Sequence, residues 1–313
     1  MRKKFVKDQA GCLEDTPLDF VFIRRLFILL IYIYFLGASL LSAIGFSSLQ
    51  VEKKELEGRI SISGAWALYP MAVRWAEEFQ KIHPRVVIDV QAGGAGKGIA
   101  DVLAGMVDIG AVSRGIHQAE VSKGAFAIAV TKDAVIPTVN EKNPCLATLL
   151  KQGARKEQFI DIWIGEKVKT WGQLLGIDEK APIHVYSRSD ACGAAETWAE
   201  FLGKRQEDLG GIGVYGDPGL ADAVRRDHLG IGYNNINYAY DAKTKKAVKG
   251  IMVLPIDLDG SGRIESGENF YSTRDEITQA IAQDIYPSPP ARELFFVTKG
   301  KPKNELVIEF IKW

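Results

Sequence analysis

The sequence predicts an α/β fold with a mainly parallel sheet, and two observations support this prediction. Short β-branched runs alternate with helical apolar patterns between residues 59 and 112, and the same order returns after residue 183. Turns rich in glycine or hydroxyl residues separate three of these strands from the helices that follow. Alternating strands and helices are typical of parallel sheets covered by helices. Ligands of such sheets bind at the carboxyl ends of the strands.

The composition is that of a globular protein. The chain has 313 residues, of which 47% are hydrophobic, with 39 Lys and Arg against 39 Asp and Glu and only three Cys. These values exclude collagen-like, disordered and disulfide-dense classes. A nucleic-acid-binding protein normally has a basic excess, so the balanced charge argues against a nucleic-acid partner.

One apolar segment near the N-terminus is long enough to cross a membrane. Leu26–Phe46 is almost wholly apolar and follows Arg24 and Arg25. About 20 such residues span a bilayer. We therefore expect residues 1–46 to be a signal peptide or a membrane anchor, followed by a linker at 47–58.

The same segment predicts where the rest of the chain lies. Its length favours a permanent anchor, whereas the small residues of Ala43-Ile44-Gly45 favour cleavage, and both alternatives stay open. Positive residues precede the segment in either case. The body of the protein is therefore expected outside the cytoplasm, periplasmic or at the cell surface, and secreted or anchored to the membrane.

The first elements of the folded body follow in a regular order. Arg59–Ile62 is a short β-branched strand, and Pro70 stands where a first helical residue belongs, since its missing N–H would be unpaired there anyway. The next strand is Val86–Val90, and the glycine-rich loop Gln91–Gly98 separates it from a short helix, Ile99–Ala104. The first helix has one apolar face with the spacing i, i+4, i+8, formed by Met71, Trp75 and Phe79.

The later elements repeat this order. Apolar runs predict further strands at Val107–Val112, Ala127–Val139, Ile183–Tyr186, Gly230–Asn234, Ile251–Ile256 and Arg292–Thr298. Helices are expected at Ala195–Leu202 and from Glu305 to Trp313.

Three turns at strand ends predict an anion site. They are Ser63–Pro70, Ala92–Gly98 and Ser187–Gly193. Glycine lets backbone N–H groups converge, and helix N-termini add partial positive charge. The alternative is that each is a plain connecting turn. The glycine loop is not a nucleotide loop, because Gly98 follows Lys97 where a P-loop needs Ser or Thr.

Several ordered motifs are similar to those of a known family. They are the Gly64–Pro70 opening, the glycine loop, Val107–Arg114, Arg188-Ser189-Asp190 with Gly193, and Gly230–Tyr233. On these motifs the chain, from about Arg59 to the end, resembles the periplasmic-type phosphate-binding proteins of the phosphate ABC transporter. The resemblance implies a two-lobe fold of the type II periplasmic-binding-protein class. It implies one lobe from 59–135 and 238–313 and another from 136–237, with the chain crossing near Val135 and returning near Tyr238.

The resemblance also implies a set of ligand-binding residues. The implied positions are Ala67, Tyr69, Ala95, Gly96, Ser113, Arg114, Arg188, Asp190, Cys192 and Gly193. Several family hydroxyls are replaced: Ala67 and Leu68 stand in the first turn, Ala95 in the glycine loop, and Cys192 and Ala194 in the third turn. Each lost hydroxyl removes a charge-assisted hydrogen bond of about 1.5–3 kcal/mol.

The expected function is binding rather than catalysis. Arg188 is expected to clamp the anion through two N–H groups, the alternative being a structural ion pair with Asp190. The protein would capture an inorganic oxyanion, with phosphate favoured, and deliver it to an ABC transporter permease, without an organic cofactor. Tungstate, molybdate or sulfate binding, or a membrane-tethered sensor with the same fold, stay open as alternatives. Cys192 at a helix start is not expected to be an enzyme nucleophile, and its pairing with Cys145 is left open.

A second, independent motif predicts a metal site. In the twelve residues from Asp257 to Glu268, oxygen donors fall at positions 1, 3, 5, 9 and 12, with Gly262 at position 6. This spacing is that of a calcium loop. A strand precedes it, so a helix–loop–helix pair is not expected, and the alternative is an acidic surface turn. The candidate residues for a structural calcium ion are Asp257, Asp259, Ser261, Arg263, Glu265 and Glu268.

Overall fold

The computed structural model describes residues 55–313, which form one compact unit. The apolar segment at residues 26–46, expected to be a signal peptide or an anchor, lies outside the described residues, as does most of the expected linker. Within residues 55–313, no helix combines the length and the apolarity needed to cross a bilayer.

The α/β fold predicted from the sequence is confirmed. The strands are β1 (Gly58–Gly64), β2 (Val86–Ala92), β3 (Ile109–Val112), β4 (Ala125–Asn140), β5 (His184–Arg188), β6 (Ile212–Val214), β7 (Gly230–Asn235), β8 (Ile251–Val253) and β9 (Ala291–Lys299). The helices are α2 (Tyr69–Ile82), α3 (Ala95–Ala104), α4 (Gln118–Ser122), α5 (Leu146–Gln152), α6 (Lys156–Trp163), α7 (Trp171–Leu175), α8 (Gly193–Phe201), α9 (Gly216–Arg226), α10 (Ile236–Ala239), α11 (Arg274–Ala282) and α12 (Glu305–Lys312), with a 3-10 turn, η1 (Gln206–Asp208).

The strands follow the order β2-β1-β3-β9-β4-β7-β5-β6, and β8 pairs with β4. β1 is parallel to β2 and β3, and β5 is parallel to β6 and β7, as expected for strands separated by helices. The long strands β4 and β9 are antiparallel to each other, and they pair antiparallel with β7 and β3 respectively. The sheet is therefore mixed, with parallel strands on both sides of a central antiparallel pair.

The first hydrophobic core lies under β1, β2 and β3. Helix α2 buries Ala72, Ala76 and Phe79. The ring of Phe79 packs edge-on against Phe310 of α12, at 5.3 Å between ring centroids. The ring of Trp75, predicted on the same helix face, packs edge-on against Phe296 of β9 at 5.8 Å. The C-terminal helix thus closes the core that the first helix begins.

The second core is richer in aromatic side chains and corrects one predicted boundary. Trp198 of α8 stacks on Tyr233 of β7, with ring centroids 5.7 Å apart. The sequence analysis placed residues 238–313 in the first lobe. Instead, Tyr240, Ile277 and Tyr286 are buried in the second core together with residues 134–231. The chain therefore returns to the first core along β9 rather than near Tyr238.

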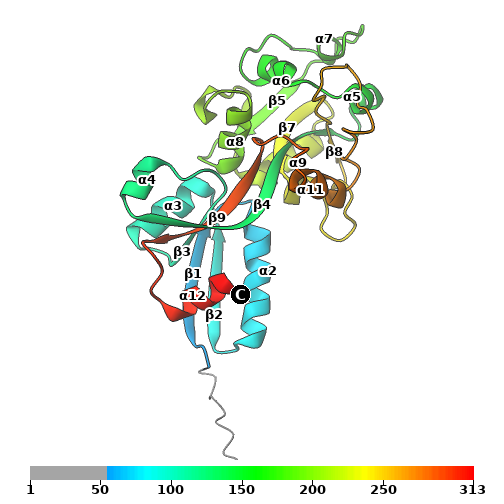
Figure 1. The fold of residues 1–313 in the computed structure, drawn as a ribbon. Coiled ribbons are helices and arrows are strands. Elements are labelled where there is room, and N and C mark those ends of the chain that lie inside the picture. The colour runs from blue at the N-terminus through cyan, green and yellow to red at the C-terminus, as the bar shows by residue number, and fades with distance from the viewer. Residues whose placement is uncertain (1–54) are drawn as a thin grey trace, which may run out of the picture. The chain divides into compact units, whose positions relative to one another are not determined.

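Strands β4 and β9 connect the two cores. Figure 1 shows them side by side, running from the first group of elements to the second. β4 pairs with β9 through Ala134 and with β7 from Val135 onward. Where β4 changes partner, Asp133 lies opposite Arg292 in the strand register. This register brings charged side chains to the junction of the two cores.

Candidate functional site

The three turns singled out in the sequence each join a parallel strand to the N-terminus of a helix. They connect β1 to α2, β2 to α3 and β5 to α8. Gly94 precedes α3 with a φ of 88°, in the left-handed region that favours glycine. Cys192 precedes α8, and its Sγ accepts a hydrogen bond from the amide of Ala195 at 3.4 Å. The helix starts are thus arranged as the sequence analysis expected.

The second and third turns lie in direct contact. The amide of Gly96 donates to the carbonyl of Ala191 at 3.3 Å. A Cβ on Gly94 would lie 2.9 Å from that carbonyl oxygen, and a Cβ on Gly193 would lie 2.4 Å from Oγ of Ser113. Such distances leave no room for a side chain, so glycine is required where the backbones meet. The structure therefore places Gly96 against Ala191, and Ser113, which directly follows β3, against Gly193.

The first turn contacts the second core through backbone oxygens. The carbonyl of Ala67 accepts a hydrogen bond from Nδ2 of Asn237 at 3.2 Å. The hydroxyl of Tyr238 donates to the carbonyl of Trp66 at 3.2 Å. The amide of Tyr69, expected to donate to an anion, instead donates within its own turn, to the carbonyls of Ala65 and Trp66. The amide of Tyr69 and the carbonyl of Ala67 are thus already used by contacts within the protein.

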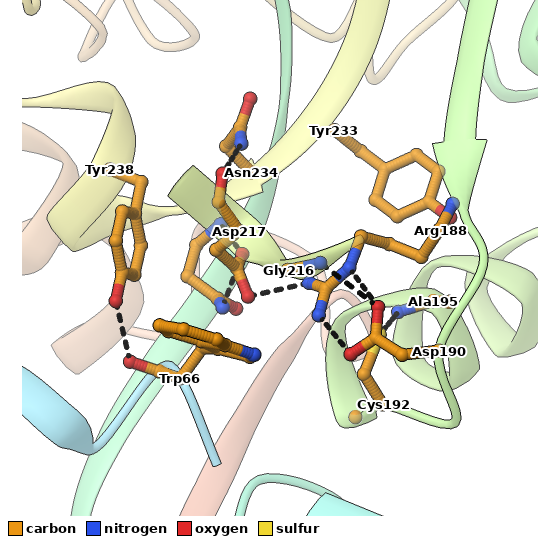
Figure 2. A network of polar contacts seen from close by, with 12 residues as sticks. Trp66, Arg188, Asp190, Cys192, Ala195, Gly216, Asp217, Tyr233, Asn234 and Tyr238 are labelled. Atoms are coloured by element: carbon orange, nitrogen blue, oxygen red, sulfur yellow. Dashed lines mark hydrogen bonds and ion pairs between the residues drawn. The ribbon is translucent and has the colours of Figure 1, made fainter. Parts of the chain in front are cut away.

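Arg188 is the centre of a buried network of polar contacts. Its side chain is fully buried at the end of β5. Nε and Nη2 donate to the two carboxylate oxygens of Asp190 at 2.8 and 2.6 Å, and Nη1 donates to Oδ2 of Asp217 at 2.5 Å. Figure 2 shows the guanidinium held between these two carboxylates. Burial opposes the charge of Arg188, but Asp217 and Asp190 raise its pKa above the ordinary value.

The network continues to the junction of β4 and β9. Oδ1 of Asp217 accepts from Nδ2 of Asn235 at 2.7 Å, and Oδ1 of Asn235 accepts from Nη2 of Arg292. Nη2 of Arg292 also lies 3.4 Å from Oδ2 of Asp133, and Nη1 donates to the carbonyl of Gly193 at 3.1 Å. Burial raises the pKa of Asp133 to about 6 and lowers that of Arg292. Both shifts show that burial outweighs the attraction between these two charges.

Arg114 is occupied by carboxylates. It forms two hydrogen bonds with Glu120, at 2.9 and 2.7 Å, and its Nε lies 2.9 Å from Oε2 of Glu196. Burial lowers its pKa, but the contacts with Glu120 and Glu196 raise it above the ordinary value. Arg114 therefore forms ion pairs with α4 and α8, and its implied place among the ligand-binding residues stays a prediction.

One indole nitrogen at this site has no partner. Nε1 of Trp66 is buried and makes no hydrogen bond within the described part of the chain. The adjacent ring carbon lies 3.3 Å from the place of a Cβ on Gly216. The amide of Gly216 in turn donates to Oδ1 of Asp190 at 3.1 Å. The orphan donor therefore lies next to the Arg188 network, as the close-up in Figure 2 also shows.

Cys192 is placed for packing rather than for nucleophilic chemistry. It is buried, and burial raises the pKa of its thiol to about 12, although Arg188 nearby lowers it in part. Cys145 is also buried, and both thiols are free in the structure. A thiol that stays protonated at neutral pH is a poor nucleophile.

Sequence analysis missed several members of the network: Trp66, Asp133, Asp217 and Arg292. Only Asp217 had a local signal, since it lies between Gly216 and Pro218 at the start of α9. An acidic residue beside proline is typical of a helix start. That signal predicts the helix but not the contact with Arg188.

The predicted metal loop brings three of its six candidate residues together. One carboxylate oxygen from each of Asp257, Asp259 and Glu268 lies within 4.8 Å of the others. The remaining candidates contact one another: Oγ of Ser261 donates to the carbonyl of Arg263 at 2.9 Å, and Arg263 donates to Oε1 of Glu265. The loop lies between β8 and α11, two elements that contribute buried residues to the second core.

Comparison with known proteins identifies the family. The family model described as "PBP superfamily domain" matches residues 51–313, most of the chain. The chain belongs to the PBP superfamily. The resemblance to phosphate-binding proteins noted from the motifs is confirmed by relatives within this superfamily.

Two curated relatives and one solved structure illustrate this similarity. The phosphate-binding protein PstS of Xylella fastidiosa (strain Temecula1 / ATCC 700964) is 24% identical over 287 residues, 82% of this chain and 77% of that protein. PstS of Bacillus subtilis (strain 168) is 28% identical over 200 residues, 64% of each chain. A substrate-binding protein with bound phosphate from Clostridium perfringens, assigned to a phosphate ABC transporter, has a TM-score of 0.65 at 22% identity, covering 82% of this chain and 92% of that one. All three proteins are named as binding proteins, and binding rather than catalysis is the function expected from the sequence.

Proposed function

We propose that this PBP superfamily protein is an extracytoplasmic solute-binding protein that holds an oxyanion, with phosphate favoured, between its two lobes and delivers it to an ABC transporter permease. The observation that carries the proposal is the buried guanidinium of Arg188, which lies where the turns before α3 and α8 approach each other. The relatives named for phosphate binding support the same ligand class. The apolar N-terminal segment supports a location outside the cytoplasm.

The site keeps several donors for an anion. A guanidinium has about five N–H donors, and the contacts of Arg188 with Asp190 and Asp217 use three of its N–H groups. The unpartnered Nε1–H of Trp66 is a further buried donor. A buried donor without a partner costs free energy, which a bound oxyanion would recover.

The carboxylates around Arg188 favour a protonated oxyanion. Ionised Asp190 and Asp217 only accept hydrogen bonds. Monohydrogen phosphate has a proton to donate to such an oxygen, whereas sulfate, molybdate and tungstate at neutral pH do not. A fully ionised oxyanion would meet only repulsion from these two groups.

A second oxyanion remains the alternative, and one observation favours it. Ala67, Ala95 and Ala194 offer no hydroxyl where the resembling family has them, and the thiol of Cys192 is a weak donor. A site with fewer hydroxyl donors is less selective for the small phosphate group. The test must therefore compare several oxyanions.

The experiment is isothermal titration calorimetry on the full chain in detergent with phosphate, sulfate, molybdate and tungstate. We expect phosphate to bind and the others to bind more weakly. Trp66→Phe removes the orphan donor together with one ring of the indole and should lower phosphate affinity about 10- to 100-fold, the loss of one hydrogen bond to a charged group. Trp75→Phe, made in the first core far from Arg188, is the matched control and should leave affinity unchanged.

Two results would overturn the proposal. Absence of heat with all four oxyanions at millimolar concentration would exclude oxyanion binding. Tighter binding of tungstate or molybdate than of phosphate would replace phosphate with the alternative ligand. If the two Trp variants bound phosphate equally well, Trp66 would not be part of the site.

A further inference from the structure

A loop outside the Arg188 network holds a cluster of carboxylates that the solute-binding function does not use. Residues 257–268 connect β8 to α11, and oxygens of Asp257, Asp259 and Glu268 lie within 4.8 Å of one another. Asp257 and Glu268 are 4% and 8% exposed, and Asp259 is exposed. Two buried carboxylates so close together need a positive partner.

Glu268 supplies the observation that points to a ligand. Its Oε1 accepts hydrogen bonds from the amides of Leu258 at 2.7 Å and Asp259 at 3.2 Å. Its Oε2 is buried and has no hydrogen-bond partner within residues 55–313. Oε2, the oxygen without a partner, thus belongs to a side chain that is more than nine-tenths buried. The two amide contacts of Oε1 hold this side chain against the start of the loop. A buried carboxylate oxygen is left in this state only at a considerable cost in free energy.

Within residues 55–313 the basic side chains nearest this loop do not pair with the cluster, although Arg155 and Lys156 line the same cavity as Asp257 and Asp259. Among the residues that the structure describes, no Lys, Arg or His forms an ion pair with Asp257, Asp259 or Glu268. Arg263, the basic residue of the loop, is turned to Glu265, with Nη2 2.8 Å from its Oε1. The three carboxylates therefore accept backbone amides but have no ion-pair partner among the described residues.

We propose that residues 257–268 bind a calcium ion through Asp257, Asp259 and Glu268. Oxygen-only ligands are those that calcium prefers, and the acidic residues stand at positions 1, 3 and 12 of a twelve-residue loop. Oδ2 of Asp257 accepts from the amide of Gly262 at 2.9 Å, which folds the loop around its first ligand. Ser261 and Glu265 complete the oxygen shell when their side chains release Arg263. The ion pair between Arg263 and Glu265 joins exposed groups, so its loss costs little free energy.

The ion stabilises the second lobe rather than the oxyanion site. Two backbone hydrogen bonds fix the loop to the end of α5 and to the segment that follows it. The amide of Ile264 donates to the carbonyl of Lys151, and the amide of Asp257 donates to the carbonyl of Ala154. Asp257 and Asp259 share a cavity of about 660 Å³ with Phe201, the last residue of α8. The first residue of α8, Gly193, belongs to the Arg188 network. The two sites therefore lie at opposite ends of one helix, and calcium binding is tested independently of oxyanion binding.

The test is thermal unfolding of the full chain in detergent, without phosphate, in EDTA, in calcium and in the same concentration of magnesium. At a calcium concentration about 100-fold above Kd, the Tm of the wild type should rise by about 5–10 °C. Glu268→Gln should lose this rise. Without calcium its Tm should equal or exceed that of the wild type, because the buried unpaired charge is gone. Glu207→Gln, an exposed site with the same chemical change, is the control and should keep the full calcium effect.

The outcomes separate a ligand from a purely structural carboxylate. If Glu268 only caps the amides of Leu258 and Asp259, Glu268→Gln should lower Tm equally with and without calcium, which would overturn the proposal. An unchanged wild-type Tm at millimolar calcium, or an equal rise with magnesium, would overturn it too. Asp259→Asn, at an exposed position, is the second variant if Glu268→Gln does not fold, and it should also reduce the calcium effect.

Discussion

The ion pair between Asp133 and Arg292 predicts an unusual pH dependence of stability. Both side chains are almost completely buried at the junction of β4 and β9, and their charged atoms are 3.4 Å apart. Burial raises the pKa of Asp133 from 3.8 to about 6, and Arg292 reverses only part of this rise. We predict that replacing Asp133 by Asn removes a destabilising contribution that grows with pH.

The magnitude follows from the two pKa values. Because the folded pKa is above the unfolded one, the folded protein holds the proton of Asp133 more tightly. The stabilisation from this proton is complete below about pH 4 and is lost as the pH rises through about 6. One pKa unit corresponds to about 1.4 kcal/mol, so the whole loss is about 3 kcal/mol. About 2 kcal/mol of it falls between about pH 4.5 and pH 7.5.

The assay is urea unfolding of the wild type and of Asp133→Asn across this pH range. The free energy of unfolding of the variant, relative to the wild type, should rise by about 2 kcal/mol from the lowest to the highest pH. Any pH-independent effect of the amide cancels in this difference. Asp284→Asn changes an exposed carboxylate and should give a flat difference. A flat or falling difference for Asp133→Asn would refute the reasoning, since it would mean that Asp133 is ionised and stabilised by Arg292 in the folded state.

Two further predictions concern the packing around the site. Gly98→Ala should lower the free energy of unfolding, measured in urea, by about 1–3 kcal/mol. The reason is that the new Cβ would lie 2.5 Å from the carbonyl oxygen of Ala111. An unchanged urea midpoint would contradict the close approach of α3 to β3. Cys145 and Cys192 should react with a thiol reagent at about pH 8 only after denaturation, because burial raises the pKa of both; rapid labelling of Cys192 in the native protein, followed by peptide mass spectrometry, would contradict its burial.

The first half of the fold could be predicted from sequence because its signals are local. The strand at 59–62 and the helix face of Met71, Trp75 and Phe79 correspond to β1 and α2 with small shifts of their ends. The glycine loop was predicted to reach Gly98, but α3 begins at Ala95 within it, and Gly98 serves the close approach of the helix to Ala111 rather than a loop. Helices α5, α6 and α7 were not predicted. They have only five to eight residues, too few to show an apolar period.

The site could be predicted only where its contacts are close in sequence. The pairing of Arg188 with Asp190 was considered, because the two residues are two positions apart. The contact of Arg188 with Asp217 spans 29 residues. That of Arg292 with Asp133 spans 159 and depends on the register of β4 against β9. Strand register is set by the whole sheet and not by the residues that it brings together. The cluster of Asp257, Asp259 and Glu268 could be predicted for the opposite reason, since its spacing lies within twelve consecutive residues.

The charges of the Arg188 network contribute to the protonation of Asp133. When all groups are ionised, the guanidiniums of Arg188 and Arg292 face three buried carboxylates, those of Asp133, Asp190 and Asp217. Among these five groups one negative charge is in excess, and the nearby guanidinium of Arg274 offsets part of it at Asp133. Asp217 accordingly contributes to the raised pKa of Asp133, after burial itself. Burial is the largest cause of the raised pKa of Asp133, and its carboxylate lies 3.4 Å from a guanidinium, farther than the 2.5 and 2.6 Å of the other two carboxylates. The pH experiment on Asp133 therefore measures how the network holds its excess charge. A flat result there would mean that Arg292 balances an ionised Asp133 next to Arg188, the side chain proposed to hold the oxyanion.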